Sequence, residues 1–228
     1  MCYTRLYWGT RELWELITNS KTKNAFTLAE VLVTLGVIGI VAAMTLPTVI
    51  SSTGDKIEIV TLQKFYSEFA NATNMIIAEY GDPSGWPLKD NNKDSVQWVV
   101  ERYQEQFSIM RTCQVGDNSC FPYPIRNRNG VPAVTASQAT SWQSMSMLLN
   151  NGIAIRFDVN KGDFSMFVDT NGFKPPGKLG EDIFVWCVNK EGRIVPSTDP
   201  SLDQSNGHSN PEYNYAFRIM ANGWKKDY

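Results

Sequence analysis

The stretch KNAFTLAEVLVTLGVIGIVAAMTLPTVI, residues 23–50, decides how the chain is organised. After Ala25 its one charged residue is Glu30, and residues 31–50 carry no charge at all. Because a helix rises about 1.5 Å per residue, this run is long enough to cross a hydrocarbon core of about 30 Å. The sequence therefore predicts a membrane-spanning helix with a carboxylate near its start.

The charges on either side of this run are unequal. Residues 1–25 carry a net charge of +2, from Arg5, Arg11, Lys21 and Lys23 against Glu12 and Glu15, whereas the whole chain of 228 residues has a net charge of -2. Basic residues before a membrane segment favour a cytoplasmic start, so we expect residues after the run to lie outside the cytoplasm. No basic stripe is long enough to follow a phosphate backbone, so we expect no nucleic-acid partner.

Two ordinary interpretations of the run remain open. It would serve as a plain signal anchor, or as a cleaved secretory signal whose apolar stretch ends at the small residues VAAM, residues 41–44. Neither interpretation assigns a role to Glu30. An ionised group in lipid costs several kcal/mol unless it is paired, so the presence of this carboxylate needs an explanation.

The same residues resemble the leader and cleavage segment of type IV pilins and type II secretion pseudopilins. The match rests on the Ala25–Phe26 junction, on Thr27, Leu28 and Glu30 after it, and on Gly39 and Pro47 further along. The family more often has Gly at the position of Ala25. The resemblance implies that a prepilin peptidase cuts between Ala25 and Phe26 and that the new amino group on Phe26 is methylated.

The resemblance also implies a role for Glu30 in assembly. Its carboxylate would attract the amino terminus of a neighbouring subunit and so set the register of a filament, while Gly39 and Pro47 would loosen or kink the helix. A second role is compatible with the first, since Thr27 and Glu30 have the spacing of a capping box at a helix start.

The remainder of the chain predicts an α+β domain. A stripe of apolar residues at helical spacing runs from Leu62 to Tyr80, and residues 95–107 predict a second, shorter helix. Two alternating runs around residues 160–162 and two more around residues 191–192 indicate hairpins. The prediction is a long amino-terminal helix, transmembrane and then amphipathic, packed on an antiparallel sheet. Residues 111–140 look like loop, and the apolar segment of residues 141–152 looks helical.

These patterns divide the chain into three parts. Residues 1–25 would be a cleaved leader, residues 26–50 the transmembrane and filament-core helix, and residues 51–228 the exported domain with the second half of the long helix. If that domain reaches an oxidising compartment, Cys113 and Cys120 would form a local disulfide, and Cys187 would be a small buried residue of a strand.

Candidate sites for ligands are few. Asp169, Asn171 and Asp182 offer oxygen atoms of the kind that calcium prefers, but their spacing departs from an EF-hand loop and Asx turns explain them equally well. We therefore expect no metal and no cofactor. The sequence has no P-loop and no G-x-S-x-G motif, and its one histidine, His208, lies in a polar loop, so we expect no enzyme.

Together these expectations describe a structural pilin or pseudopilin subunit in the inner membrane. Its partners would be the prepilin peptidase and other pilin or pseudopilin subunits, and its carboxy-terminal domain would lie in the periplasm or outside the cell. The alternative is an anchored or secreted module that binds a glycan or a protein.

Overall fold

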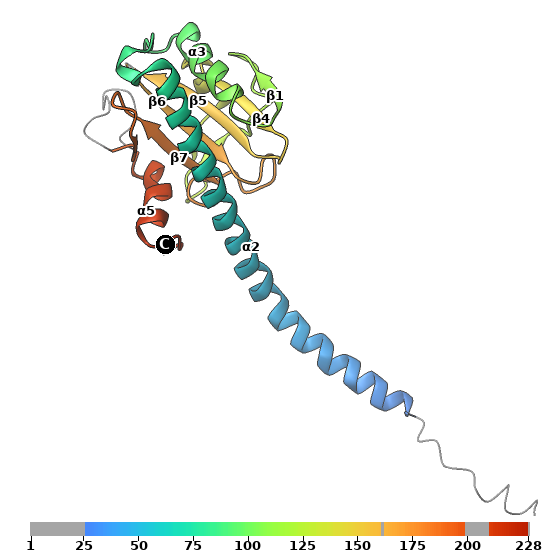
Figure 1. The fold of residues 1–228 in the computed structure, drawn as a ribbon. Helices are drawn as coiled ribbons and strands as arrows, with labels where there is room; N and C mark the ends of the chain where they lie inside the picture. Colours follow the sequence, from blue (N-terminus) through green and yellow to red (C-terminus); the bar gives the residue numbers. More distant parts are fainter. Residues whose placement is uncertain (1–25, 161, 199–209, 228) are drawn as a thin grey trace, which may run out of the picture. The chain divides into compact units, whose positions relative to one another are not determined.

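The computed structural model describes residues 26–160, 162–198 and 210–227, with residues 47–56 described by their backbone alone. Contacts divide the chain into two units, with the boundary between Ser52 and Thr53. The first unit holds the apolar half of the long helix α2, and the second holds the rest of α2 and the sheet (Figure 1).

The helices and strands follow one another along the chain as an α+β fold. The helical elements are α2 (Leu28–Tyr80), η1 (Pro83–Gly85), α3 (Lys93–Gln104), α4 (Ala136–Ser141), η3 (Pro211–Asn214) and α5 (Tyr215–Ala221). The strands are β1 (Ile109–Cys113), β2 (Ile125–Arg126), β3 (Pro132–Val134), β4 (Met145–Leu149), β5 (Ala154–Asn160), β6 (Asp163–Asp169), β7 (Ile183–Val188) and β8 (Ile194–Val195). The prediction of an antiparallel sheet with helices is confirmed.

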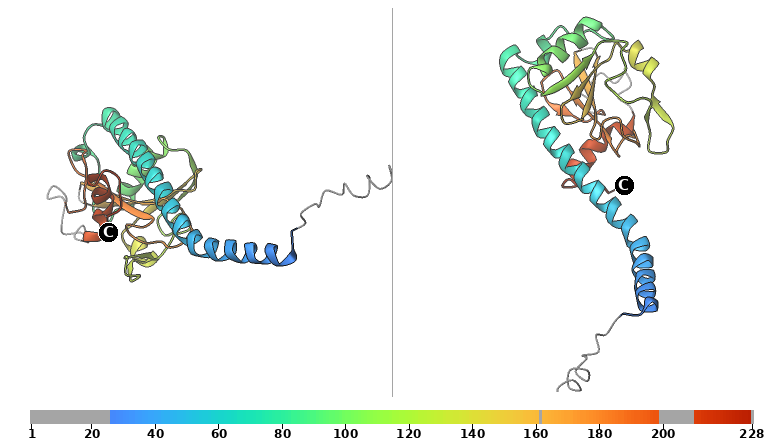
Figure 2. Two further views of the ribbon diagram at one scale, coloured as in Figure 1. Left: turned by 90° about the horizontal axis from the view of Figure 1, so that it is seen from below. Right: turned by 90° about the vertical axis from the view of Figure 1, so that its right-hand side faces the viewer.

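One sheet dominates the second unit. Its strand order is β1-β4-β5-β6-β7-β8 and every neighbouring pair is antiparallel, while β2 and β3 form a separate two-stranded sheet. The central hairpin pairs Asn160 with Asp163 and Ala154 with Asp169. In both views of Figure 2 the carboxy-terminal part of α2 lies against the strands of the second unit. The register of β1 against β4 is irregular between Ile109 and Arg111, so one rim of the sheet carries a bulge.

The predicted stripe of α2 packs on one face of this sheet. Five of its apolar side chains are buried, namely Leu62, Phe65, Phe69, Ala72 and Ile76. Phe65 and Phe69 both contact Trp186 of β7, with ring centroids 5.8 and 6.3 Å apart. The helix ends where Gly81 adopts a φ of 76° and donates its N–H to the carbonyl of Ile77 at 2.8 Å, an end that glycine favours.

The short helix α3 covers the same face and is joined to α2 by a buried hydrogen bond. Its residues Val96, Val99, Val100 and Tyr103 are buried, as the periodicity predicts. The hydroxyl groups of Thr73 and Tyr103 lie 2.7 Å apart, and Thr73 Oγ1 donates to the carbonyl of Phe69 at 2.8 Å. Tyr103 is therefore the donor to Thr73, and burial raises the pKa of its phenol well above the ordinary value.

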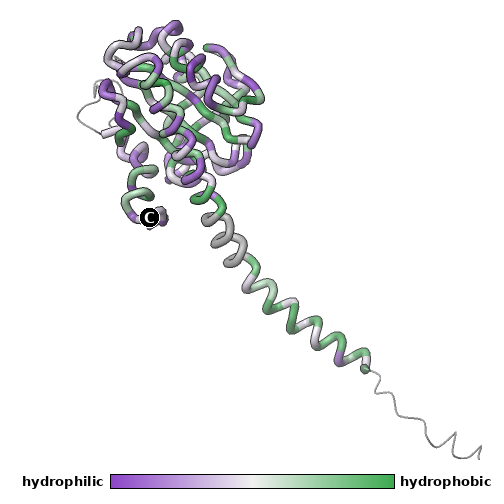
Figure 3. Tube along the Cα trace, in the orientation of Figure 1, coloured by the Kyte–Doolittle hydropathy of each residue, from purple (hydrophilic) through white to green (hydrophobic). Residues whose placement is uncertain are grey.

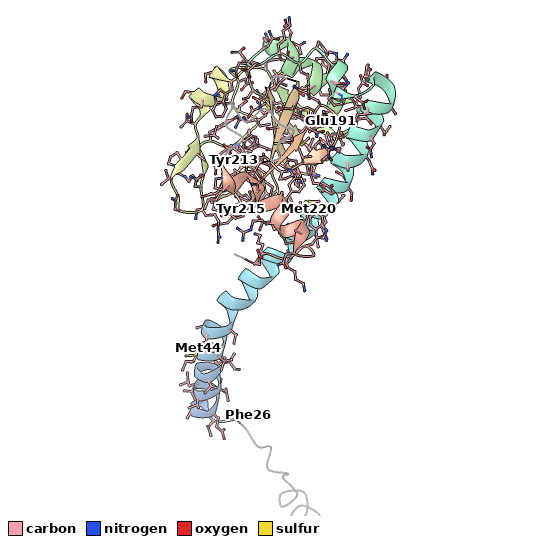
Figure 4. All side chains as sticks on the ribbon, turned by 90° about the vertical axis from the view of Figure 1, so that its left-hand side faces the viewer. Phe26, Met44, Glu191, Tyr213, Tyr215 and Met220 are labelled. Carbon is pink, nitrogen blue, oxygen red and sulfur yellow. A yellow bond between two sulfur atoms is a disulfide. The ribbon has the colours of Figure 1, made fainter. Side chains whose placement is uncertain are left out.

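The opposite face of the sheet has its own apolar cluster. It consists of Phe121, Ile125, Val134, Ala154, Phe167, Leu179, Ile183 and Val185. Tyr213 of η3 meets Phe167 edge-on with centroids 5.2 Å apart, and Figure 4 labels it beside Tyr215. Because both faces are covered, every residue of β6 and β7 is buried.

Two expectations about the middle of the chain are wrong. Residues 111–140, expected to be loop, contain part of β1, both strands of the small sheet and most of α4. The segment expected to be helical holds β4, in which Met145, Met147 and Leu149 alternate toward the α2 face. β1 obtains its hydrogen bonds from β4, which lies more than 30 positions further along the chain, and local pattern does not reveal such a partner.

The cysteines of the second unit differ in state. Cys113 and Cys120 are joined by a disulfide with an S–S distance of 2.03 Å. Cys187 lies fully buried in β7 and outside this disulfide, which confirms its predicted place in a strand.

Candidate functional site: the amino-terminal segment and a buried carboxylate loop

The apolar half of α2 shows its side chains on all sides. Within the described residues, Leu28–Leu46 is the helix long and apolar enough to cross a membrane, and none of this segment is buried inside the protein. Phe26 is 86% exposed and Met44 is 74% exposed. Figure 3 shows the hydrophobic colour concentrated along this segment, and Figure 4 shows its side chains standing out between Phe26 and Met44. A helix that is apolar all round requires an apolar environment.

Polar groups inside this segment are satisfied within the helix itself. Thr34 Oγ1 donates to the carbonyl of Val31 at 2.9 Å, and Thr45 Oγ1 donates to the carbonyl of Val41 at 2.9 Å. These bonds leave no hydroxyl group that needs water, which suits a helix in lipid.

Glu30 closes a capping box at the start of α2, as its spacing from Thr27 predicts. Its Oε2 accepts hydrogen bonds from the backbone N–H of Thr27 at 2.8 Å and from Thr27 Oγ1 at 2.9 Å. In return, the N–H of Glu30 donates to Thr27 Oγ1 at 3.2 Å. The box satisfies two N–H groups at the helix start and places a negative charge where the helix dipole is positive.

The other residues of the predicted site lie around this cap. Phe26 directly precedes it, and Ala25 lies outside the described residues. Gly39 has open space where a side chain would be, and α2 continues without interruption through Gly39 and Pro47.

Residues 20–46 match the family described as the prokaryotic N-terminal methylation motif. The chain carries the prepilin-type segment of type IV pilins and pseudopilins. This match covers the junction of Ala25 and Phe26, the carboxylate of Glu30, and the apolar helix to Leu46. Searches of curated proteins and of solved structures find no match to the chain.

The prepilin-type segment supports a pilin-like or pseudopilin subunit, a class that is structural rather than enzymatic. It implies processing by a prepilin peptidase and assembly with other such subunits, and together with the apolar helix it indicates membrane anchoring.

The second candidate site lies in the loop between β6 and β7. Asp182 organises this loop, because its Oδ2 accepts the N–H of Gly177 at 2.8 Å and its Oδ1 accepts the N–H of Lys178 at 2.6 Å. Asn171 Nδ2 also donates to Asp182 Oδ2, at 3.1 Å. Asp169 starts the loop with an Asx turn, in which its Oδ1 accepts the N–H of Asn171 at 3.0 Å.

The structure thus brings Asp169, Asn171 and Asp182 into one loop, although they are spread over the sequence from β6 to the start of β7. Among the described residues, no group of three or more His, Cys, Asp or Glu side chains is placed to hold a metal ion. The sequence did not reveal that the backbone N–H groups of Gly177 and Lys178 form the cradle for Asp182. No residue type signals it, because the donors are backbone groups.

Trp86 and His208 complete the set of candidate residues. Trp86 is buried, donates Nε1–H to the carbonyl of Gly81 at 2.9 Å and packs on Trp98 with centroids 4.8 Å apart. His208 lies outside the described residues.

Proposed function

We propose that this chain is a structural pilin or pseudopilin subunit of a type II secretion or type IV pilus-like filament. In this proposal a prepilin peptidase cuts between Ala25 and Phe26, the new amino group is methylated, and the subunit assembles through the apolar half of α2. The observation that carries the proposal is the coincidence of the methylation motif with an apolar helix of membrane length, none of which is buried.

The place of Glu30 supports the assembly step. Cleavage before Phe26 creates an ammonium group one helical turn from the Glu30 carboxylate. Before assembly, the Thr27 N–H and hydroxyl groups hold that carboxylate. When apolar helices pack side by side, pairing it with the ammonium of a neighbouring subunit removes two isolated charges from lipid together.

The proposed topology follows from charge and from the disulfide. The basic residues before the helix favour a cytoplasmic leader, and a disulfide between Cys113 and Cys120 is stable in an oxidising compartment. The second unit, from Thr53 onward, would therefore face the periplasm or the cell exterior while the helix remains in the inner membrane.

Mass spectrometry of the chain purified from membranes tests the proposal. The expected amino terminus is N-methylated Phe26, and Ala25→Leu, which removes the small residue before the cut, is expected to leave the precursor intact. A mature chain that starts at Met44, or one that retains residues 1–25, would refute the proposal and favour a secreted or anchored binding module.

A further inference from the structure

At the loop of residues 170–182, which joins β6 to β7, two buried oxygen atoms lack a hydrogen-bond donor. Asp169 Oδ2 and Asn171 Oδ1 are both buried and neither has a hydrogen-bond partner in the structure. Asp169 itself is fully buried. An unpartnered acceptor is costly to bury, and an ionised one costs far more.

The orientation of Asn171 is fixed by its neighbours. Its Nδ2 donates to Asp182 Oδ2 at 3.1 Å and to the carbonyl of Pro175 at 3.4 Å, so its Oδ1 must point the other way. The Asx turn meanwhile commits Asp169 Oδ1 to the N–H of Asn171. Asp169 Oδ2 and Asn171 Oδ1 are therefore two acceptors of the same turn, and neither has a donor.

The charges around Asp169 would oppose its ionisation. Asp182, across the loop, and Glu58 of α2 are both acidic and act on it repulsively. The nearby cations are committed elsewhere, since Lys226 Nζ lies 2.5 Å from Glu58 Oε2 and Lys178 Nζ lies 3.6 Å from Glu181 Oε1. The strand partners of Asp169 are Ala154 and Ile183, which offer no charge.

We propose that Asp169 carries a proton on Oδ2 in the folded domain, with Asn171 Oδ1 as the acceptor in the same turn, and that loss of this proton loosens the Thr170–Asp182 loop. A proton supplies the missing donor and removes the buried charge at once. In line with this geometry, burial and the neighbouring Asp182 raise the pKa of Asp169 to about 8.

Loss of the proton from Asp169 would change the conformation of the exposed tip of the loop. Phe173 is 54% exposed, and Lys174, Pro175 and Pro176 beside it are exposed as well. The hydrogen bonds to Asp182 hold both ends of this tip, so a closed loop presents it in one conformation.

The effect on stability has a definite sign. The folded state keeps a proton that the unfolded state releases above about pH 4, so the contribution of Asp169 to stability is full below that pH and is lost as the pH rises toward about 8. One retained proton lowers the folding equilibrium constant roughly tenfold per pH unit in that window. Because the pKa of Asp182 is raised too, the measurement must be a difference between variants.

The test is chemical denaturation of the full chain in detergent micelles, from about pH 5 to pH 8, for the wild type and Asp169→Asn. The amide mimics the protonated acid, so the ratio of the variant's folding constant to that of the wild type should rise roughly tenfold per pH unit. Asp82→Asn is the control, because Asp82 is exposed and makes no side-chain cap on η1. Infrared spectra at neutral pH should show a protonated carboxyl band that Asp169→Asn removes.

Two results would overturn the proposal. A ratio that does not change with pH, with no carboxyl band, would mean that Asp169 is ionised. If Asp169→Asn instead destabilises the domain at neutral pH, and millimolar calcium chloride stabilises the wild type alone, the two acceptors bind a cation and not a proton.

Discussion

Glu30 and Thr27 are joined by three hydrogen bonds at the first turn of α2, between 2.8 and 3.2 Å long. Glu30 therefore has a structural partner before any second subunit is present. The role of the carboxylate in the cap and its proposed role in assembly can be separated by substitution, because an amide retains the acceptor and loses the charge.

Glu30→Gln and Glu30→Ala form the first prediction. Both should be processed to Phe26, and both should fail to co-assemble with wild-type subunits, because neither offers a negative charge to a neighbouring ammonium. Recovery of tagged variants in the sheared filament fraction measures this. If Glu30→Gln assembles like the wild type while Glu30→Ala does not, the cap alone matters and the pairing role is wrong.

The buried hydrogen bond between Thr73 and Tyr103 gives the second prediction. Tyr103→Phe should lower the free energy of unfolding by about 1–3 kcal/mol, because Thr73 loses its donor in a site closed to water. Thr73→Val should cost a similar amount, since it leaves the Tyr103 hydroxyl without an acceptor.

Denaturant titration of the double variant completes this cycle. Its cost should be smaller than the sum of the two single costs, because no unpaired hydroxyl group then remains. Strict additivity would contradict a direct bond between the two side chains.

The disulfide leads to the third prediction. Replacing both Cys113 and Cys120 by Ser should destabilise the second unit by about 2–3 kcal/mol, because the unfolded chain regains the freedom of the closed loop. Thermal unfolding with and without reductant measures the effect: the wild type should lose stability on reduction and the double variant should be insensitive. Cys187 is buried and takes no part in the disulfide, so its thiol does not account for such a loss.

Two glycines with positive φ provide the fourth prediction. A Cβ on Gly172 would lie 2.4 Å from the backbone carbonyl oxygen of Gly152, whereas a Cβ on Gly116 would meet nothing within 4 Å. Their φ angles are 71° and 89°, so Gly→Ala strains the backbone at both positions. Gly116→Ala should cost about 1 kcal/mol from strain alone.

Gly172→Ala should cost clearly more, since the backbone of the β4–β5 turn must also move. Equal melting temperatures for the two variants would show that the β6–β7 loop does not pack on that turn as described.

Sequence pattern predicted most of the fold where local signals and final contacts agree. The stripe from Leu62 to Ile76 was recognisable because its spacing is helical and its buried face is continuous. The two hairpins around β5–β6 and β7–β8 were recognisable because their turns contain glycine.

The strands β1 and β4 escaped prediction for a physical reason. β1 contains Arg111 and Thr112, and its partners lie 33 to 40 positions away, from Cys113 with Ser146 to Ile109 with Leu149. In β4 the Met-rich run fits a helix as well as a strand, and only the neighbouring β1 and β5 decide between them. The arrangement of the loop that holds Asp169 and Asp182 was not predicted either. The groups that bind Asp182 are backbone N–H groups, which no residue type in the sequence indicates.

The irregular rim at β1 has one more consequence. A regular outer strand offers unused N–H and C=O groups as a template on which a second polypeptide extends the sheet, which is how many proteins aggregate. Here the bulge between Ile109 and Arg111 and the charged side chain of Arg111 interrupt the regular pattern of N–H and C=O groups on β1. At the other edge of the sheet, β8 is only two residues long. The two rims of this sheet therefore disfavour edge-to-edge pairing between copies of the chain.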